Sequence, residues 1–279
     1  MKRFSTAVAG SVLLALLVGI TGCSDEDPEV EEGCLGLFGI VGESTGLDDD
    51  KCNRACDCPD EEWQAPEYDA AFVEELRQWT LVDEMQVPDE DPYVDESFQL
   101  PPRDGYCGVV IEDFGDRTYS LQTFATVDEL EEAGARLTHQ EACGLCSTLE
   151  DLATYIEHTE LTEPVRECGM QGVFNGEEVQ LDCIEELGFS RSCAQIWSWN
   201  TTNTREECMS ICMQYMNEPH NEPDGSLNEC LQCDEDKSGE VFQAVAGRTR
   251  RNSGLPSAIC RPCADLFRMS HLQVVEETE

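Results

Sequence analysis

Three Cys-x-x-Cys pairs are the residues of this 279-residue chain whose type and spacing best fit a known chemistry. Cys143-Gly144-Leu145-Cys146 has the spacing of a dithiol exchange pair, and a cysteine beside a helix N-terminus can have a lowered pKa. Cys230 and Cys233 are separated by 26 residues from Cys260 and Cys263, a spacing that a zinc site with four thiolate ligands can use. The cysteines therefore suggest two chemistries, thiol–disulfide exchange and zinc binding.

The sequence around Cys143 and Cys146 favours a structural role over exchange. A thioredoxin-like enzyme has a buried β-strand directly before the motif, whereas residues 136–141 here form a polar run. The motif also precedes a helix cap instead of entering the helix. We therefore expect structural disulfides, and a redox pair of Cys143 and Cys146 is the alternative.

Helix signals place the cysteines relative to the core. Ser147-Thr148-Leu149-Glu150 is a capping box, and the apolar residues that follow it recur with helical spacing. A second helix is expected between Asn175 and Gly188, a third after Ser190, and a fourth from a capping box at Thr204–Glu207. The apolar faces of the last three helices carry four cysteines that we expect in the core: Cys183, Cys193, Cys208 and Cys212.

The region before these helices combines loops with a hairpin. Apolar residues at helical spacing predict a helix over residues 66–80, and the proline-rich acidic stretch 83–102 is expected to be an extended connector. Two β-branched and aromatic runs flank Asp113-Phe114-Gly115-Asp116 and predict a hairpin over residues 107–124, and Thr126 then caps a short helix. The expected fold is mainly α, a disulfide-stapled helical domain with a small β-hairpin, preceded by an acidic, loop-rich N-terminal region.

The N-terminus has the pattern of an export signal. Basic residues precede the apolar run Ala7–Ile20, which is too short to span a bilayer but has the length of a signal-peptide core. The run ends in Ile20-Thr21-Gly22-Cys23, which resembles the lipobox of bacterial lipoproteins. The resemblance implies cleavage before Cys23, acylation of that cysteine and, because Ser24 replaces aspartate, sorting to the outer membrane. An ordinary secretory signal with a chance cysteine is the alternative.

The number of cysteines agrees with an oxidising compartment. Lipidation of Cys23 leaves 16 of the 17 cysteines, an even number. The candidates for structural disulfides are Cys34, Cys52, Cys56, Cys58, Cys107, Cys143, Cys146, Cys168, Cys183, Cys193, Cys208, Cys212, Cys230, Cys233, Cys260 and Cys263. Their connectivity cannot be read from spacing. A zinc site of Cys230, Cys233, Cys260 and Cys263 is the second alternative, disfavoured because exported thiols are normally oxidised.

The expected partners follow from the anchor and the net charge. No run after residue 22 is long or apolar enough to cross a bilayer, so we expect attachment to the membrane through the Cys23 lipid anchor. The formal charge is −42, and loss of Lys2 and Arg3 with the signal leaves 15 basic and 59 acidic residues, or −44. Nucleic acid is excluded because phosphate binding needs clustered positive charge. The remaining partner is an unknown protein or envelope component.

Two further motifs have a structural and a functional interpretation each. Asp234–Gly239 matches the first half of a calcium loop, but Val245 stands where the closing glutamate belongs, so we predict a polar turn before a helix starting near Glu240. The basic cluster of Arg248, Arg250 and Arg251 either pairs internally with carboxylates or forms an anion-binding patch.

We expect no cofactor. The sequence has no nucleophile-elbow or phosphate-loop pattern, so a non-enzymatic protein is favoured over an enzyme.

Part of the helical block resembles a known group of proteins. The matching strings are Cys143-Gly144-Leu145-Cys146-Ser147-Thr148, Gly188-Phe189-Ser190 with Cys193-Ala194 and Trp197, Leu227-Asn228-Glu229-Cys230 with Cys233-Asp234-Glu235, and Ala246-Gly247-Arg248 with Arg250-Arg251 and Ser253-Gly254. They are similar to an uncharacterised cysteine-rich, secreted or membrane-associated family of protists, over residues 140–260. The resemblance implies no activity. Ser238-Gly239-Glu240 stands where that pattern has Cys-Gly-Pro, which implies at least one altered bridge.

These observations define an expected organisation and role. The expected segments are a signal peptide (1–22), an acidic tether (23–33), a cysteine-containing acidic region with a proline-rich connector (34–102), and a disulfide-rich, mainly helical domain (103–279). The expected protein is an exported, lipid-anchored component of the cell envelope with a structural or binding role. Its location would be the outer membrane, facing the periplasm or the cell surface.

Overall fold

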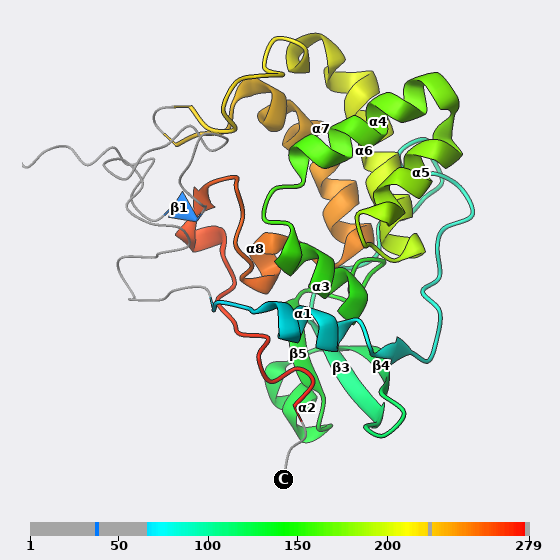
Figure 1. The fold of residues 1–279 in the computed structure, drawn as a ribbon, viewed down its shortest axis with the longest axis vertical. Coiled ribbons are helices and arrows are strands. Elements are labelled where there is room, and N and C mark those ends of the chain that lie inside the picture. Colours follow the sequence, from blue (N-terminus) through cyan, green and yellow to red (C-terminus); the bar gives the residue numbers. More distant parts are fainter. Residues whose placement is uncertain (1–36, 39–65, 223–224, 277–279) are drawn as a thin grey trace, which may run out of the picture. The chain divides into compact units, whose positions relative to one another are not determined.

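Eight helices, a small four-stranded mixed sheet and a two-stranded sheet of β1 and β6 form the part of the chain that the computed structural model describes, residues 37–38, 66–222 and 225–276 (Figure 1). The helices are α1 (Ala70–Leu76), α2 (Val127–Glu132), α3 (Leu149–Glu157), α4 (Thr162–Asn175), α5 (Glu177–Glu186), α6 (Arg191–Cys212), α7 (Glu229–Ala246) and α8 (Arg250–Ser253), with a 3-10 turn, η2 (Cys263–Asp265). The strands are β1 (Leu37–Phe38), β2 (Thr80–Leu81), β3 (Tyr106–Asp113), β4 (Thr118–Phe124), β5 (Arg136–Gln140) and β6 (Arg261–Pro262). The mainly α fold with a small β element is confirmed. The proposed signal and lipobox, with Cys34, Cys52, Cys56 and Cys58, lie outside the described residues.

The main sheet has the strand order β2-β4-β3-β5. Strands β3 and β4 form the predicted antiparallel hairpin, in which Val109 lies opposite Leu121. Strand β5 pairs antiparallel with β3, and the two-residue β2 pairs parallel with β4. The prediction that residues 136–141 supply no buried strand is wrong, because β5 lies there with Thr138 and His139 fully buried. Their polar groups have hydrogen-bond partners inside the protein, which a hydropathy pattern does not reveal.

Side-chain caps explain where most of the predicted helices begin. Helix α3 starts one residue later than predicted, since the Thr148 hydroxyl accepts a hydrogen bond from Asp151 N at 3.0 Å. Helix α6 starts after Ser190, which accepts from Cys193 N. Helix α5 lies within the predicted limits, and α1 is shorter than the predicted helix. Helix α4 was not predicted, and its cap residue, Leu161, makes no side-chain cap bond.

Two predicted boundaries inside the helical block are wrong. The Thr204 box does not start a helix, because α6 continues through it and the Thr204 hydroxyl donates to the Asp234 carboxylate of α7. The predicted polar turn at residues 234–239 is helical, because α7 already begins after Asn228, whose side chain accepts from Leu231 N at 2.9 Å. At both boundaries the polar side chain of the local signal, Thr204 or Asp234, bonds to the neighbouring helix instead of marking a helix end.

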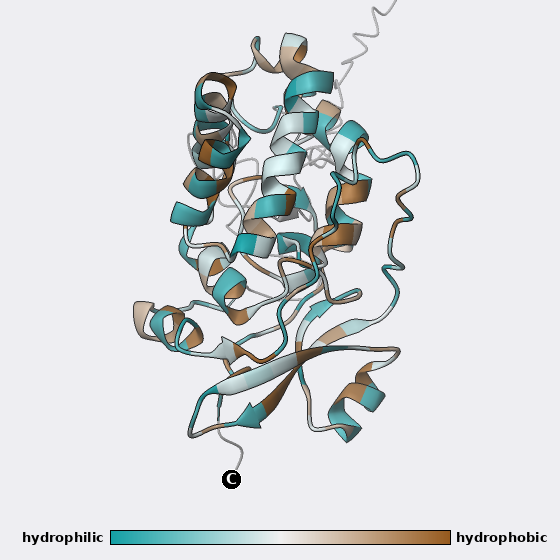
Figure 2. Cartoon of the chain, turned by 90° about the vertical axis from the view of Figure 1, so that its right-hand side faces the viewer, coloured by the Kyte–Doolittle hydropathy of each residue, from teal (hydrophilic) through white to brown (hydrophobic). Residues whose placement is uncertain are grey.

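One hydrophobic core joins the sheet to the helices. It contains Val109 and Tyr119 of the hairpin together with residues of α1, α3, α5 and α6. The Tyr119 hydroxyl also accepts a hydrogen bond from Leu149 N at 2.9 Å, at the first residue of α3. In Figure 2 the helices carry both hydrophilic and hydrophobic residues, as expected for helices with one buried side. The sheet and the helical block therefore depend on each other for burial.

Five disulfides cross-link the described residues. They are Cys107–Cys143, Cys146–Cys193, Cys168–Cys183, Cys208–Cys233 and Cys212–Cys230. The first joins the hairpin to the segment after β5, the second joins that segment to α6, and the others join neighbouring helices. A disulfide-rich protein of this kind fits an oxidising compartment.

The segment before the hairpin contacts the helical block directly. Residues 83–102 contain no helix or strand, and Tyr93 places its hydroxyl 2.8 Å from Asn200 Oδ1 and 3.0 Å from the Ser238 carbonyl. Trp79, just before β2, packs edge-on against Phe114 in the hairpin turn. None of the helices in the described ranges is long and apolar enough to cross a membrane.

Candidate functional site

The segment from Cys143 to Thr148 runs beside the C-terminal end of α7. Leu145 N donates to Val245 O at 2.9 Å, and Cys146 N donates to Ala246 O at 2.8 Å. A Cβ atom on Gly144 would lie 2.5 Å from Val245 O, so glycine is required where the two backbones meet. The Cys-x-x-Cys segment is therefore held as part of the scaffold, pressed against another chain segment.

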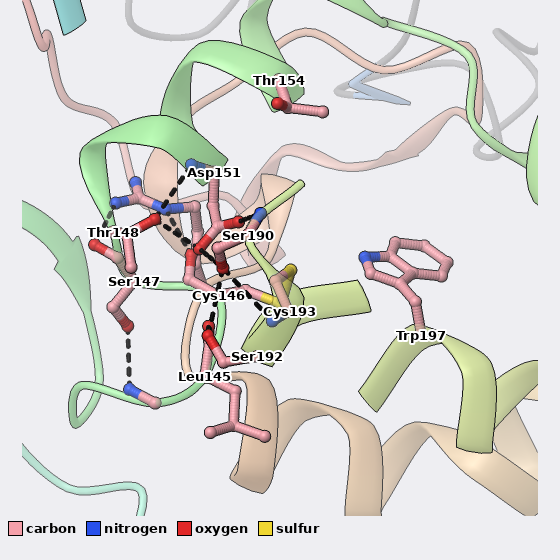
Figure 3. The surroundings of a disulfide bond; sticks show 12 residues. Leu145, Cys146, Ser147, Thr148, Asp151, Thr154, Ser190, Ser192, Cys193 and Trp197 are labelled. Atoms are coloured by element: carbon pink, nitrogen blue, oxygen red, sulfur yellow. Dashed lines mark hydrogen bonds between the residues drawn. A yellow bond between two sulfur atoms is a disulfide. The ribbon is translucent and has the colours of Figure 1, made fainter. Parts of the chain in front are cut away.

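The two cysteines of this segment are bonded to different partners. Cys143 is joined to Cys107 of β3, and Cys146 is joined to Cys193 of α6 (Figure 3). Cys107, Cys146 and Cys193 have no exposed surface, whereas Cys143 is half-buried. An exchange pair consists of two neighbouring cysteines that form a disulfide with each other. The pair that the redox alternative requires is therefore not formed here.

Arg248 occupies the centre of this region with no exposed surface. Its guanidinium donates to Thr138 O at 3.0 Å and Thr138 Oγ1 at 2.6 Å, and to the carbonyls of Cys146 and Ser147, each at 3.0 Å. Burial lowers the pKa of Arg248 to about 10, so the side chain is still charged at neutral pH. We call the meeting point of β5, residues 143–148 and residues 247–249 the Arg248 junction.

His139 and Ser147 in the junction have the geometry of a base and a nucleophile. His139 Nε2 lies 2.7 Å from Ser147 Oγ, and Nδ1 lies 2.8 Å from the Gln140 carbonyl. A carbonyl only accepts, so Nδ1 carries the proton and Nε2 accepts from the serine hydroxyl. Burial, and then the charge of Arg248, lower the pKa of His139 well below its ordinary value. Neither side chain has exposed surface, so a substrate cannot reach the pair, which stabilises the backbone instead.

Asp151 connects the junction to the start of α6. Its carboxylate accepts from the Thr148 hydroxyl at 2.6 Å, and from the backbone N and hydroxyl of Ser190 at 2.9 and 3.0 Å (Figure 3). Complete burial raises the pKa of Asp151 to about 6, although these hydrogen bonds oppose the shift. Ser192 adds a bond from its hydroxyl to Leu145 O at 3.1 Å. These contacts fix the two helix starts beside the Cys146–Cys193 disulfide.

The other two arginines of the predicted cluster also have internal partners. Arg250 donates to the carbonyls of Tyr155 and Pro256, each at 2.7 Å, and to the carbonyl of His158. Arg251 donates to Glu235 at 2.6 Å. Internal pairing with a carboxylate thus describes Arg251, whereas Arg248 and Arg250 bind backbone carbonyls. For Arg250 these include carbonyls at the C-terminal end of α3, where cations are favoured.

The cysteines of the zinc alternative are placed differently from a four-thiolate site. Cys230 is bonded to Cys212 and Cys233 to Cys208, so neither supplies a thiolate. Cys260 is buried, and the side chain of Cys263 is not among those described. Within the described ranges, no group of three or more His, Cys, Asp or Glu side chains is placed to hold a metal ion.

Two of the hollows in the described part of the protein lie beside segments of this scaffold. One, of about 410 Å³, lies beside Cys143–Leu145 and is lined mainly by apolar side chains that include Met85, Phe98 and Leu121. The other, of about 290 Å³, lies where residues 91–94 face α5 and α6. No sequence pattern indicates either hollow, because both are formed by segments distant in the chain.

The described chain is a disulfide-stapled, mainly helical protein of the kind found in oxidising compartments. A family described as a family of unknown function (DUF8771) matches residues 177–269, about a third of the chain. The matched part is similar to that family from α5 to beyond η2, and it contains both partners of the Cys208–Cys233 and Cys212–Cys230 disulfides. The comparisons found no matching curated protein and no matching solved structure.

Proposed function

We propose that this chain is an exported, lipid-anchored protein of the cell envelope, in which the stapled body has a structural or binding role. The observation that carries the proposal is the set of five disulfides, since such bonds persist in exported proteins and are rare where thiols are kept reduced. The buried His139–Ser147 pair and the separately bonded Cys143 and Cys146 favour a scaffold over an enzyme.

The anchor rests on the sequence before the described body. Cys23 follows an apolar run of signal-peptide length, and the residues before it are similar to a lipobox. Stable attachment to a bilayer needs more than one acyl chain, and a lipoprotein cysteine carries several. Ser24 in place of aspartate favours the outer membrane. The resemblance to a cysteine-rich family of protists supports only the export part of the proposal, because that family is also secreted or membrane-associated.

The anchor is tested by expressing the full chain in a bacterial host fed a clickable fatty acid. The wild type is expected to take up the label and to fractionate with membranes, and Cys23→Ala to take up none and to leave the membrane fraction or stay unprocessed. Ser24→Ala is the matched control, since it changes the next residue and keeps the cysteine. An unlabelled wild type, or a processed Cys23→Ala variant that still fractionates with membranes, contradicts the proposal.

A further inference from the structure

The smaller hollow combines aromatic and carboxylate side chains from three segments of the chain. We call it the acidic–aromatic cavity, and its volume is about 290 Å³. The side chains that give it its character are Asp91, Tyr93, Glu177, Glu178, Trp199 and Glu206. Asp91 and Tyr93 come from the segment before the hairpin. Glu177 and Glu178 lie in the first turn of α5, and Trp199 and Glu206 lie on α6. A ligand in the cavity would therefore touch all three segments.

The aromatic wall of the cavity is fixed in place. Trp199 is half-buried, packs against the core on one side and lines the cavity. Within the described chain its ring makes no stacking or cation–π contact, whereas Trp197, on the same helix, packs against Tyr155, Phe189 and Phe242. An indole face is the strongest cation–π partner that a side chain offers.

The loop that supplies Asp91 and Tyr93 to the cavity is held against α6. Tyr93 N donates to Asp91 Oδ1 at 2.9 Å, and the Tyr93 hydroxyl lies within hydrogen-bond distance of Asn200 on α6. These contacts place the Asp91 carboxylate against the helices without any ligand. The cavity is therefore preformed, which lowers the entropic cost of binding.

The carboxylates of the cavity lack basic partners, with one exception. Glu178 contacts Arg191 at 2.6 Å, but no basic side chain in the described ranges lies within ion-pair distance of Asp91, Glu177 or Glu206. Burial raises the pKa of Asp91, and the charges of Glu177 and Glu206 raise it further, while the bond from Tyr93 N opposes the shift. Like charges are thus held close together around a space large enough for a cation.

The arrangement fits an organic cation better than a metal ion. Four carboxylates line the cavity, but no group of three or more His, Cys, Asp or Glu side chains among those described is placed to hold a metal ion. A metal ion needs several oxygens at about 2.0–2.6 Å, whereas an alkylammonium ion spreads its charge over methyl groups and favours an aromatic face. The volume suits a small ion rather than a polypeptide segment.

We propose that the acidic–aromatic cavity binds a small organic ammonium ion, with Trp199 against its alkyl groups and Asp91, Glu177 and Glu206 balancing its charge. The inference rests on the binding role proposed above and gives that role a ligand class. It is independent of the lipid anchor, because the cavity is formed entirely within the folded body.

The test is a calorimetric titration of the oxidised, full-length protein in detergent with choline as the probe. Choline is expected to bind about tenfold more tightly than its uncharged carbon isostere, because only the cation gains from the indole face and the carboxylates. Equal binding of the two compounds, no binding of choline, or displacement of choline by calcium ions would overturn the proposal.

Three variants separate the site from the general negative charge of the protein. Trp199→Leu keeps an apolar wall and is expected to weaken choline binding about tenfold. Glu206→Gln is expected to weaken it about threefold, since it removes one nearby charge. Glu186→Gln removes the same charge from an exposed residue of α5 that does not line the cavity, and binding should be unchanged.

The variants are compared only where the helical circular dichroism and the disulfide content match the wild type. If Trp199→Leu does not fold, the two glutamate variants decide the question, because both change exposed side chains. An equal loss of binding in Glu206→Gln and Glu186→Gln would mean that choline responds only to net charge, and the proposal would be wrong. Choline binding that persists in Cys23→Ala shows that the cavity and the anchor succeed or fail separately.

Discussion

The Arg248 junction and the acidic–aromatic cavity use charge in opposite ways. The junction buries one cation completely and surrounds it with three backbone carbonyls and a hydroxyl, which accept four hydrogen bonds from the guanidinium. The cavity keeps several anions at the surface, most of them without a basic partner among the described side chains. Buried polar groups that are fully hydrogen-bonded hold a structure together, whereas unpaired accessible charges can bind a ligand.

The disulfides give the largest expected contrast, between the junction and the helix pair α4–α5, whose second helix begins at the cavity. Cys146–Cys193 is fully buried at the junction and closes a loop of 47 residues, whereas Cys168–Cys183 joins α4 to α5 and closes a loop of 15. Loop-closure entropy predicts losses of about 4 kcal/mol and about 3 kcal/mol in the free energy of unfolding when each pair is replaced by alanine. Burial of the first pair should increase the difference.

Chemical denaturation of the two double-alanine variants measures this contrast. Helical circular dichroism reports unfolding, and each variant is compared with the wild type under the same oxidising conditions. A smaller loss for Cys146→Ala with Cys193→Ala than for the α4–α5 pair would show that the junction is held by its hydrogen bonds and packing, with little contribution from the disulfide.

The second prediction concerns the free energy of unfolding at acid pH, because a histidine is buried near the junction. His271 is fully buried, and its Nε2 donates to Ser253 O at 2.8 Å, while Nδ1 has no hydrogen-bond partner among the residues that the structure describes. Burial, followed by the charge of Arg248, lowers the pKa of His271 to about 3. A lowered pKa means that protonation favours the unfolded chain. The contribution of neutral His271 to the free energy of unfolding is complete above the pKa of histidine in the unfolded chain, about 6.5. It is lost as the pH falls from there toward 3.

The effect of His271 is isolated by comparing the wild type with His271→Asn, whose amide can still donate to Ser253 O. Titration of the many surface carboxylates is common to both proteins and cancels in the difference. Between pH 6.5 and pH 5 the wild type is expected to lose about 2 kcal/mol relative to the variant in denaturant unfolding. Parallel stability curves would mean that His271 is not buried in its neutral form.

Sequence patterns predicted the local structure of this chain better than its long-range contacts. The helices that begin at Leu149 and Arg191 and the hairpin at Asp113–Asp116 follow from short signals, because caps and turns are made by neighbouring residues. The cysteine partners could not be derived, since Cys146 and Cys193 meet only once the core is formed. The same limit applies to Thr204, whose capping pattern is local but whose hydroxyl bonds to Asp234 on another helix.

The Arg248 junction and the cavity also depend on long-range contacts that the sequence does not predict. The sequence singles out the basic cluster of Arg248, Arg250 and Arg251, but the complete burial of Arg248 depends on the carbonyls of Cys146 and Ser147, about a hundred residues earlier in the chain. The contact of His139 with Ser147 was missed because residues 136–141 have no apolar alternation. Asp91 and Trp199 line one cavity only because Tyr93 is anchored on α6, a contact that no sequence motif records.

The smallest contrast compares two threonine caps. Thr148 at the start of α3 is buried at the junction, where it accepts from Asp151 N and donates to the Asp151 carboxylate at 2.6 Å. Thr126 at the start of α2 is exposed and accepts only from Glu129 N, at 3.2 Å. Replacing a capping threonine by alanine costs about 0.5–2 kcal/mol. Thr148→Ala should lie at the upper end of that range, because it also removes a donor from a buried carboxylate.

Thr126→Ala should lie at the lower end, since water can replace the lost hydrogen bond at an exposed helix start. The two variants carry the same chemical change, so the difference in their free energies of unfolding measures how much the buried Asp151 network adds to a simple cap. Removal of the Thr148 hydroxyl should also raise the pKa of Asp151, because that hydrogen bond lowers it in the wild type. The Thr148→Ala penalty should therefore be larger at pH 8 than at pH 5, where protonation of Asp151 relieves the loss, while the Thr126→Ala penalty stays constant. Equal penalties for the two variants at both pH values would show that the junction is no more tightly coupled than an exposed helix end.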